Sequence, residues 1–319
     1  MRHVIVGGLG YLGVNLAEEL ERRGFRVIVV GRRGSEARRP RIAARLRAMG
    51  VQLELPESLR AGGLRDLGGD VYYYLVGRIS GSLEEFREAH VELLGETVKA
   101  AGELGARVVY VSAVSAVGEV RGLKPGSVVY EEEDHLNPEV HKHYSYHGLT
   151  KAEGERLLRS SRELRGKWSI VRPGLLLGPW AYHSEWAAYR RALSARIAPK
   201  LGRRIPLVHV KDVAEILAEA GEGRYDGLWL NAVSHHPDLS DLVIEGCRQT
   251  GARCITIPLK PLASTALALK PLIPRGRPEA LTLELLSLNY EYRSRILKKN
   301  WRSLQEAVRD FLEWAKNNL

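Results

Sequence analysis

The chain has 319 residues and a mass of 35.6 kDa, enough for one large α/β domain with a C-terminal lobe or for two domains that share a cleft. Apolar residues make up 45% of the chain and charged residues 27%, which excludes disordered and fibrous proteins. No apolar run approaches the roughly 20 residues that cross a bilayer, so a membrane-spanning protein is excluded as well.

The N-terminus starts at once with a strand-like run and has no signal-peptide pattern. Two cysteines, Cys247 and Cys254, are too few for a disulfide scaffold or a zinc site, and no spacing of the histidines matches a zinc pattern. We therefore expect a protein of the reducing cytoplasm that holds no metal.

The net charge of +10 comes largely from arginine, while methionine occurs only twice. Abundant ion-pairing residues and few thermolabile side chains indicate a heat-adapted source. Ten arginines fall between residues 22 and 47, a cluster interpreted as a solvated basic surface, an anionic cofactor site or a nucleic-acid patch. No nucleic-acid recognition module is present, so we expect no specific nucleic-acid partner.

The first half of the chain alternates short apolar runs with longer helical patterns. Strands are predicted at residues 3–6, 26–30, 52–55, 71–76, 107–112 and 168–172. Helices are predicted between them at residues 12–23, 36–49, 83–104 and 146–163. Strands separated by helices imply right-handed crossovers and a parallel sheet, and runs such as VYYYLV indicate strands that are covered on both faces.

Regularity declines after about residue 174. Helices are predicted there at residues 185–196, 211–222 and 303–318, and short strands near residues 228–231 and 254–258. The predicted fold is an α/β, doubly wound parallel sheet with a smaller C-terminal lobe. Residues 1–173 are expected to form a dinucleotide-binding domain and residues 174–319 a substrate lobe, interleaved with the sheet and without a true linker.

A glycine-rich turn joins the first predicted strand to the first predicted helix. In GGLGYLG the glycines satisfy G-x-G-x-x-G counted from Gly8, and G-x-x-G-x-x-G counted from Gly7. Glycines there allow a tight turn and a close approach of the backbone to a pyrophosphate at the helix N-terminus. This context predicts a Rossmann-type dinucleotide site. Its predicted residues are Gly7, Gly10, Tyr11, Leu12 and Gly13.

The end of the second predicted strand is a further cofactor contact. A site that selects NAD usually places Asp or Glu there to bind the ribose 2′-hydroxyl. Here the position is Gly31, followed by Arg32 and Arg33. Without the carboxylate a 2′-phosphate is not repelled, and guanidinium groups bind phosphate bidentately. The sequence therefore predicts NADP (NADPH) in preference to NAD.

Six motifs in register resemble those of the extended short-chain dehydrogenase/reductase family, which includes nucleotide-sugar epimerases, dehydratases and 3β-hydroxysteroid dehydrogenase-like reductases. In chain order they are VGGLGYLG, DVYYYLVG, VVYVSAVSAVGE, YHGLTKAEGERLL, VRPGLLLGPW and LVHVKDVAEIL. Residues 258–286 most resemble the hydroxysteroid dehydrogenase branch. The resemblance implies hydride transfer with NAD(P) at a carbinol or carbonyl carbon of a nucleotide sugar or an apolar alcohol.

The resemblance also implies positions for further residues. Leu75, Val76 and Gly77 belong to the strand that lies beneath the nicotinamide in the family, and Pro173 to the segment that leads into the substrate lobe. The family commonly forms homodimers through the helices that correspond to residues 83–104 and 146–163 here. We therefore expect a homodimer.

The catalytic positions depart from the family pattern. That chemistry needs a Tyr and a Lys one helical turn apart, with the Lys binding the cofactor ribose and lowering the pKa of the Tyr that exchanges the proton. Lys151 matches the lysine, but the tyrosine position is His147. The position of the family's Ser or Thr falls on Ala113, and its neighbours Ser112 and Ser115 can substitute only if the loop shifts.

Three explanations for this departure remain open. In the first, His147 is the acid/base, because imidazole titrates near neutrality. In the second, Tyr144 takes this role, provided that the helix begins early enough to place it on the face of Lys151; Tyr146, about 100° around the helix from His147, fits less well. In the third, the protein is a catalytically silent NADP(H)-binding protein with a structural or redox-sensing role, since a fold alone does not establish chemistry.

The apolar stretch PLASTALALKPLIP lies within residues 258–274. It has four interpretations: the wall of a substrate pocket, a flap, a segment that rests on a membrane surface, or core. Core is the commonest fate of such a segment.

Overall fold

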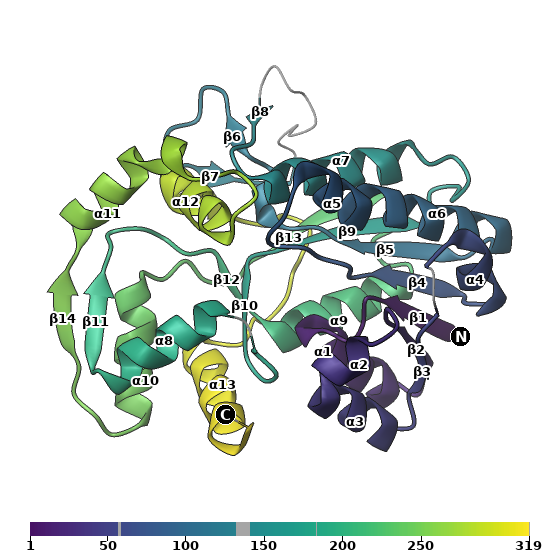
Figure 1. Ribbon diagram of the computed structural model, residues 1–319, viewed down its shortest axis with the longest axis horizontal. Coiled ribbons are helices and arrows are strands. Elements are labelled where there is room, and N and C mark those ends of the chain that lie inside the picture. The colour runs from purple at the N-terminus through teal and green to yellow at the C-terminus, as the bar shows by residue number, and fades with distance from the viewer. Residues whose placement is uncertain (57–58, 132–140, 183, 319) are drawn as a thin grey trace.

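The computed structural model describes residues 1–56, 59–131, 141–182 and 184–318. Its centre is a seven-stranded parallel sheet in the order β13-β9-β5-β4-β1-β2-β3 (Figure 1). The strands are β1 (Arg2–Val6), β2 (Arg26–Val30), β3 (Gln52–Glu54), β4 (Val71–Tyr74), β5 (Arg107–Val111), β9 (Trp168–Pro173) and β13 (Leu228–Ala232). Because the chain builds outward from β1 in both directions, the sheet is doubly wound, which confirms the predicted fold class.

Helices cover both faces of this sheet. One face carries α1 (Tyr11–Arg22), α3 (Pro40–Ala48) and α9 (Val210–Gly221), and the other carries α4 (Ala61–Asp66), α6 (Leu93–Leu104) and α7 (Tyr146–Ser160). Successive strand residues alternate between the two cores: Tyr73 packs in the first, whereas Tyr72 and Tyr74 pack in the second. Burial on both sides explains why these strands are apolar throughout.

Two predicted helices are interrupted. The helix predicted at residues 36–49 is divided into α2 (Ser35–Arg38) and α3, because Pro40 has no N–H and restarts the helix as its first residue. The helix predicted at residues 83–104 contains a π-helical turn, η1 (Glu88–Glu92), between α5 (Leu83–Arg87) and α6. Such turns are frequent at functional sites, and this one carries the buried His90.

The C-terminal lobe is built from shorter elements. They are β10 (Leu175–Leu177), α8 (Ser184–Ser194), β11 (Ile197–Lys200), β12 (Leu207–His209), α10 (Leu239–Gln249), β14 (Ile255–Pro258), α11 (Lys260–Ala268), η3 (Lys270–Leu272), α12 (Pro278–Leu288) and α13 (Leu304–Asn318). Strands β10 and β12 pair with each other, as do β11 and β14. Although they follow residue 173, α9 and β13 return to the main sheet, and the domain boundary at residue 174 stays a prediction.

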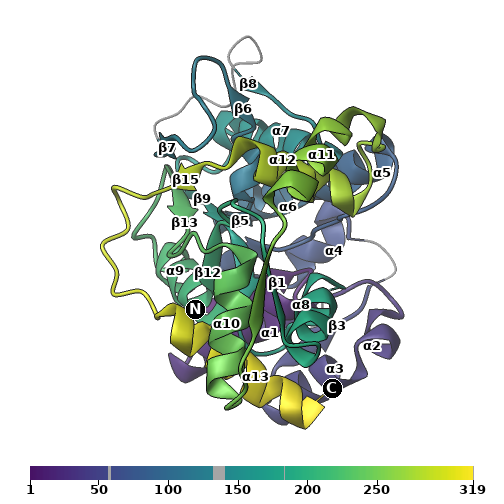
Figure 2. The same cartoon turned by 90° about the vertical axis from the view of Figure 1, so that its left-hand side faces the viewer.

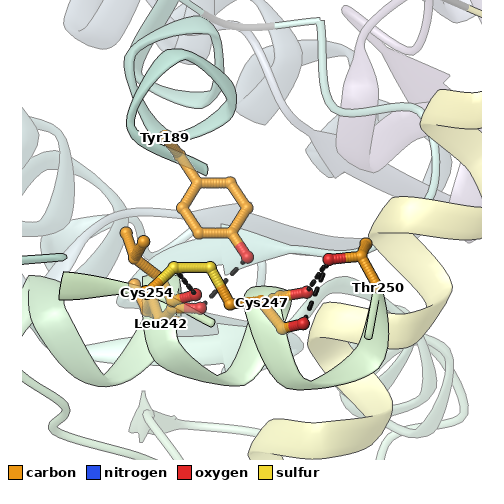
Figure 3. The surroundings of a disulfide bond; sticks show 7 residues. Tyr189, Leu242, Cys247, Thr250 and Cys254 are labelled. Atoms are coloured by element: carbon orange, nitrogen blue, oxygen red, sulfur yellow. Dashed lines mark hydrogen bonds between the residues drawn. A yellow bond between two sulfur atoms is a disulfide. The ribbon is translucent and has the colours of Figure 1, made fainter. Parts of the chain in front are cut away.

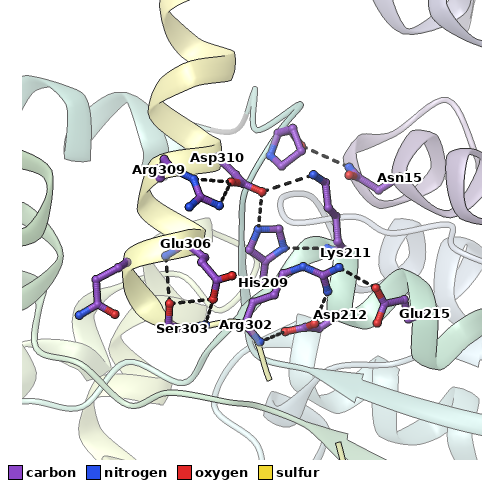
Figure 4. A network of polar contacts seen from close by, with 12 residues as sticks. Asn15, His209, Lys211, Asp212, Glu215, Arg302, Ser303, Glu306, Arg309 and Asp310 are labelled. Atoms are coloured by element: carbon purple, nitrogen blue, oxygen red, sulfur yellow. Dashed lines mark hydrogen bonds and ion pairs between the residues drawn. The ribbon is translucent and has the colours of Figure 1, made fainter. Parts of the chain in front are cut away.

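Short two-stranded pairs cover the carboxyl edge of the main sheet near α7. β6 (Glu119–Val120) pairs with β8 (His141–Lys142), and β7 (Val128–Val129) pairs with β15 (Glu291–Tyr292). Helix α13 packs against α10, and polar contacts tie it to the start of α9 (Figure 4): Asp310 lies 3.3 Å from both His209 Nε2 and Lys211 Nζ. Arg302, just before α13, pairs with Asp212 of α9.

Cys247, in the last turn of α10, and Cys254, just before β14, form a disulfide with a Cα–Cα distance of 6.1 Å (Figure 3). The bond closes a single short loop, so the expectation that two cysteines form no disulfide scaffold holds. The bond itself was not predicted from the sequence. Among the residues that the structure describes, no helix combines the length and the apolar character that a bilayer crossing needs.

Candidate active site

The turn from β1 to α1 requires its glycines. Gly7 has a φ of +80°, and a Cβ there would lie 2.9 Å from the backbone nitrogen of Val76. A Cβ on Gly13 would collide with the carbonyl group of Gly8. At Gly10, the N-cap of α1, a Cβ would meet only one atom within 4 Å, so the space in front of the helix is open.

This open space fits the pyrophosphate of a dinucleotide. The backbone N–H groups and the positive end of the α1 dipole point at the place where the phosphates would lie. The side chains of Tyr11 and Leu12 are buried in the core, so these two residues offer only their backbone. The residues present at this turn therefore fit a dinucleotide.

The end of β2 is shaped by the absence of a side chain. Gly31 is buried, and a Cβ there would lie 2.6 Å from Leu9 Cδ1. A carboxylate side chain at this position would have to displace Leu9. Arg32 and Arg33 follow on an exposed turn, and the carbonyl oxygen of Arg32 accepts a hydrogen bond from Ser35 N at 2.9 Å.

The remaining predicted cofactor residues lie at the carboxyl ends of the parallel strands. Leu75 N donates to Val6 O at 2.9 Å, and the carbonyl oxygen of Val76 accepts from Lys151 Nζ at 3.4 Å. Gly77 is exposed, and Pro173 is the last residue of β9. In open α/β sheets ligands bind at this edge.

Lys151 is held at the carboxyl end of β5. It lies on α7, its side chain is nearly buried, and Nζ donates to Val111 O at 2.9 Å. Its ammonium group lies 5.0 Å from the centre of the Tyr110 ring. Burial lowers the pKa of Lys151 to about 7, and the charge of Glu155 opposes this shift.

His147 lies one helical turn before Lys151 and meets Ser115. Ser115 belongs to a 3₁₀ turn, η2 (Val114–Ala116), and its Oγ lies 3.1 Å from His147 Nδ1, within hydrogen-bond distance. The loop therefore brings Ser115, rather than Ala113, to the imidazole. Burial first, and then the charge of Lys151, lowers the pKa of His147 to about 3, so the imidazole is neutral near pH 7.

His90 completes the cluster and was missed by the sequence analysis. Its ring meets that of His147 edge to face, with centroids 5.4 Å apart. His90 Nε2 accepts from the backbone N–H of Arg78 at 3.0 Å, so the ring proton is on Nδ1, which donates to Thr150 Oγ1 at 2.8 Å. His90 reaches this place through the π-helical turn, and no motif spacing signals it.

Ser112 is engaged elsewhere. Its hydroxyl donates to Glu155 Oε1, and Glu155 pairs with Arg172 at 2.8 Å. Both charged side chains are completely buried, so the three residues form a structural network between α7 and β9. Of the two serines that flank Ala113, the structure brings only Ser115 to His147.

Tyr144 does not lie on the face of Lys151. Helix α7 begins at Tyr146, with Ser145 as its N-cap, so the condition for a role of Tyr144 on this helix is not met. The Tyr144 hydroxyl instead donates to the carbonyl oxygen of Ile273 at 2.6 Å, in the segment that follows α11. Tyr146 packs its ring under the guanidinium group of Arg275.

Glu284 of α12 holds the start of α7, and sequence reasoning missed it too. Its carboxylate accepts from Tyr144 N at 2.6 Å, from Ser145 N at 3.2 Å and from the Ser145 hydroxyl. Ser145 Oγ in turn accepts a hydrogen bond from the backbone N–H of Gly148, the residue after His147, and so caps the start of α7. Burial raises the pKa of Glu284. A segment more than 130 residues away thus positions the candidate catalytic helix.

Comparisons with known proteins agree with this architecture. Residues 3–225 match the family model described as the NAD dependent epimerase/dehydratase family. No curated protein matches the chain.

Several solved structures are similar over the whole chain. MoeE5 in complex with UDP-glucuronic acid and NAD has 18% identity and a TM-score of 0.72, with 100% of both chains covered. UDP-glucose 4-epimerase from Bifidobacterium longum, in complex with NAD⁺ and UDP, has 13% identity and a TM-score of 0.72, with 100% of this chain and 99% of that chain covered. UDP-N-acetylglucosamine 4-epimerase from Bacillus cereus has 14% identity and a TM-score of 0.70, with 99% of both chains covered. At such identities the likeness concerns the fold.

Proposed function

Because the chain belongs to the NAD dependent epimerase/dehydratase family, an enzyme family of oxidoreductases and epimerases, we propose that it carries out hydride transfer at a carbinol or carbonyl carbon with His147 in the place of the family's tyrosine. The observation that carries this proposal is the cluster of Lys151, His147 and Ser115 at the carboxyl ends of β4 and β5. These are the groups that can hold a ribose and move a proton at that edge of the sheet.

When bound, the nicotinamide supplies the group that accepts or returns the hydride. In the proposal Lys151 turns its ammonium from the strand carbonyls to the cofactor ribose. The neutral imidazole of His147 takes the proton from the substrate hydroxyl, directly or through Ser115, with which Nδ1 shares a hydrogen bond. Hydrogen bonds at both ring nitrogens fix the ring of His90. In the proposal this fixed ring packs against the imidazole of His147 and keeps it in place.

Nucleotide sugars are the proposed substrates, ahead of apolar alcohols. The support comes from MoeE5, whose structure holds UDP-glucuronic acid, and from the Bifidobacterium enzyme, whose structure holds UDP. A spectrophotometric assay with a panel of UDP-sugars and simple secondary alcohols tests the choice. Turnover confined to the alcohols would overturn it.

NADP(H) is the proposed cofactor, although the two similar structures named above contain NAD. The support is Gly31, which carries no carboxylate and where a side chain would have to displace Leu9, and the exposed Arg32 and Arg33 beside it. We expect NADPH to bind at least about tenfold more tightly than NADH, because charge-assisted hydrogen bonds to a 2′-phosphate stabilise the complex by about 1.5–3 kcal/mol. Calorimetric titration of both cofactors decides this, and equal affinities would remove the argument.

One observation favours a second candidate, the catalytically silent cofactor-binding protein. A pKa of about 3 makes His147 a weak base in the protein without ligands. Absence of turnover with every substrate and both cofactors, together with activity gained by the double variant Ala113→Ser, His147→Tyr, would support this candidate over the enzyme.

The proposed assembly is a homodimer through α6 and α7. Leu149 and Leu157 of α7 are only partly buried within one chain and are available to a partner helix, whereas Leu158 belongs to the core. Light scattering should give twice the chain mass of 35.6 kDa. A value equal to the chain mass would reject the dimer.

A further inference from the structure

We propose that the C-terminal lobe docks on an anionic lipid surface through β11, β14, α11 and η3. The docking face consists of Ile197, Ile255, Ile257, Leu262, Leu269 and Leu272. This inference is independent of the proposed reaction, because it rests on the outer side of the lobe and its test measures binding.

The strand part of the docking face is one side of a two-stranded ribbon. Ile197 of β11 lies directly opposite Ile255 of β14, and Ile257 follows two residues later on the same side. Ala198, which points to the other side, is completely buried. All four residues of β14 are exposed, so Ala198 is the one buried residue of the ribbon, and Ile255 is 70% exposed.

The helical part continues directly from β14. No residue of α11 or η3 is buried, so the interpretation of residues 258–274 as core is wrong. Leu262 of α11 and Leu269, the residue that directly follows α11, are 63% and 50% exposed, and Leu272 of η3 is 76% exposed. Figure 1 shows β11, β14 and α11 along one edge of the molecule, and Figure 2 views the molecule from that edge.

The exposed helix is anchored rather than loose. At its start Leu259 N donates to Lys200 O at 2.8 Å, and beyond η3 Ile273 O accepts from the Tyr144 hydroxyl at 2.6 Å. The segment of α11 and η3 that carries the three exposed leucines is thus held at both of its ends. Large apolar surfaces of this kind mark interaction sites, because leaving them in water is unfavourable.

Charge identifies the partner. No Asp or Glu occurs between Glu245 and Glu279, while this stretch contains Arg253, Lys260 and Arg277, all of which are exposed. Leucines flanked by basic residues match a lipid surface that offers acyl chains beneath anionic headgroups. A second copy of the chain would instead bring the same basic residues against one another.

Sedimentation of the full-length protein with vesicles tests the proposal. We expect binding to vesicles of phosphatidylglycerol and phosphatidylcholine, and at least tenfold weaker binding to vesicles of phosphatidylcholine alone. The double variant Leu269→Gln, Leu272→Gln should lower the partition coefficient by about tenfold or more. The matched control is Leu228→Gln on β13, which is 37% exposed outside the docking face and outside the proposed dimer helices and should bind like the wild type.

The charge requirement is tested separately. Lys260→Gln and Arg277→Gln should each weaken binding to anionic vesicles about fivefold, whereas Lys298→Gln, which is exposed outside the docking face and the proposed dimer helices, should not. Absence of vesicle binding by the wild type, or equal binding by the leucine variant, would overturn the proposal. Loss of a dimer in the leucine variant, without vesicle binding by the wild type, would assign the face to a second copy.

Discussion

The two ends of the candidate site are built in different ways. The pyrophosphate end is a backbone feature: Gly7 is required by its positive φ and by the approach of Val76, Gly13 is required by the carbonyl of Gly8, and peptide groups would meet the ligand. The proton-handling end consists of side chains from separate elements, with His90 on η1, Ser115 on η2 and His147 on α7. A change at the first end should therefore remove cofactor binding, and a change at the second should remove turnover alone.

The largest expected effect on cofactor affinity is that of Gly13→Ala. The new methyl group would collide with the carbonyl of Gly8, so the turn must open. We expect cofactor affinity to fall about 100-fold and the free energy of unfolding to fall by about 2–3 kcal/mol. Calorimetry and urea unfolding measure both.

The control for this change is Gly62→Ala. Gly62 is also helical, and a Cβ there would meet nothing within 4 Å. It should leave cofactor affinity unchanged. Cofactor affinity retained by Gly13→Ala would mean that the turn is not the pyrophosphate site.

Glu284 allows a second test of the difference between the two ends, because it lies on α12 and holds the start of the helix that carries His147. Glu284→Ala removes the acceptor for two backbone N–H groups at the start of α7, which should cost about 1–3 kcal/mol of stability. If the helix start shifts, kcat should fall about tenfold while KM for the cofactor changes little.

The conservative variant Glu284→Gln keeps a carbonyl oxygen and should restore most of the turnover. A purely structural role would lower stability in both variants without this difference in kcat. Equal kcat in Glu284→Ala and the wild type would show that α12 does not position His147.

Lys151 predicts a pH dependence of stability in the protein without cofactor. Its pKa is about 7 in the folded protein, below its value in the unfolded chain, so between pH 7 and 10 the unfolded state binds more protons. The free energy of unfolding should therefore rise with pH in this window, by at most about 1.4 kcal/mol per pH unit. Urea unfolding at pH 7 and 9 measures the rise.

The comparison variant is Lys151→Met, which has no group to titrate and should lose this part of the pH dependence. If the free energy of unfolding of the wild type falls from pH 7 to 9 relative to the variant, burial does not lower the pKa of Lys151.

Features that depend on the local chain are predictable from the sequence. The glycine pattern is visible within seven residues, although the contact that requires Gly7 is with the distant Val76, and strands buried on both faces follow from unbroken apolar runs. The division of a helix at Pro40 is equally local, although the periodic pattern of apolar residues obscured it. The match of Lys151 to the family lysine depended on spacing along one helix.

Features that depend on contacts between distant segments were not predictable. His90 reaches the site because a π-helical turn adds a residue, and such a turn has no sequence signature. Ser112 and Ser115 are alike in sequence, and only the packing of Glu155 against Arg172 assigns them different partners. The exposure of α11 is the opposite of what its composition indicates, because none of the elements in the described part of the chain buries its side chains.

The most direct test of the account is the turnover of His147→Phe compared with its affinity for NADPH. We expect kcat to fall roughly 1,000-fold, within the range for loss of a general acid or base, while the dissociation constant of NADPH changes by less than about twofold. His147→Tyr, which places a phenol one turn from Lys151, should retain activity. Wild-type turnover in His147→Phe, combined with loss of turnover in Tyr144→Phe, would contradict the assignment of the proton to His147.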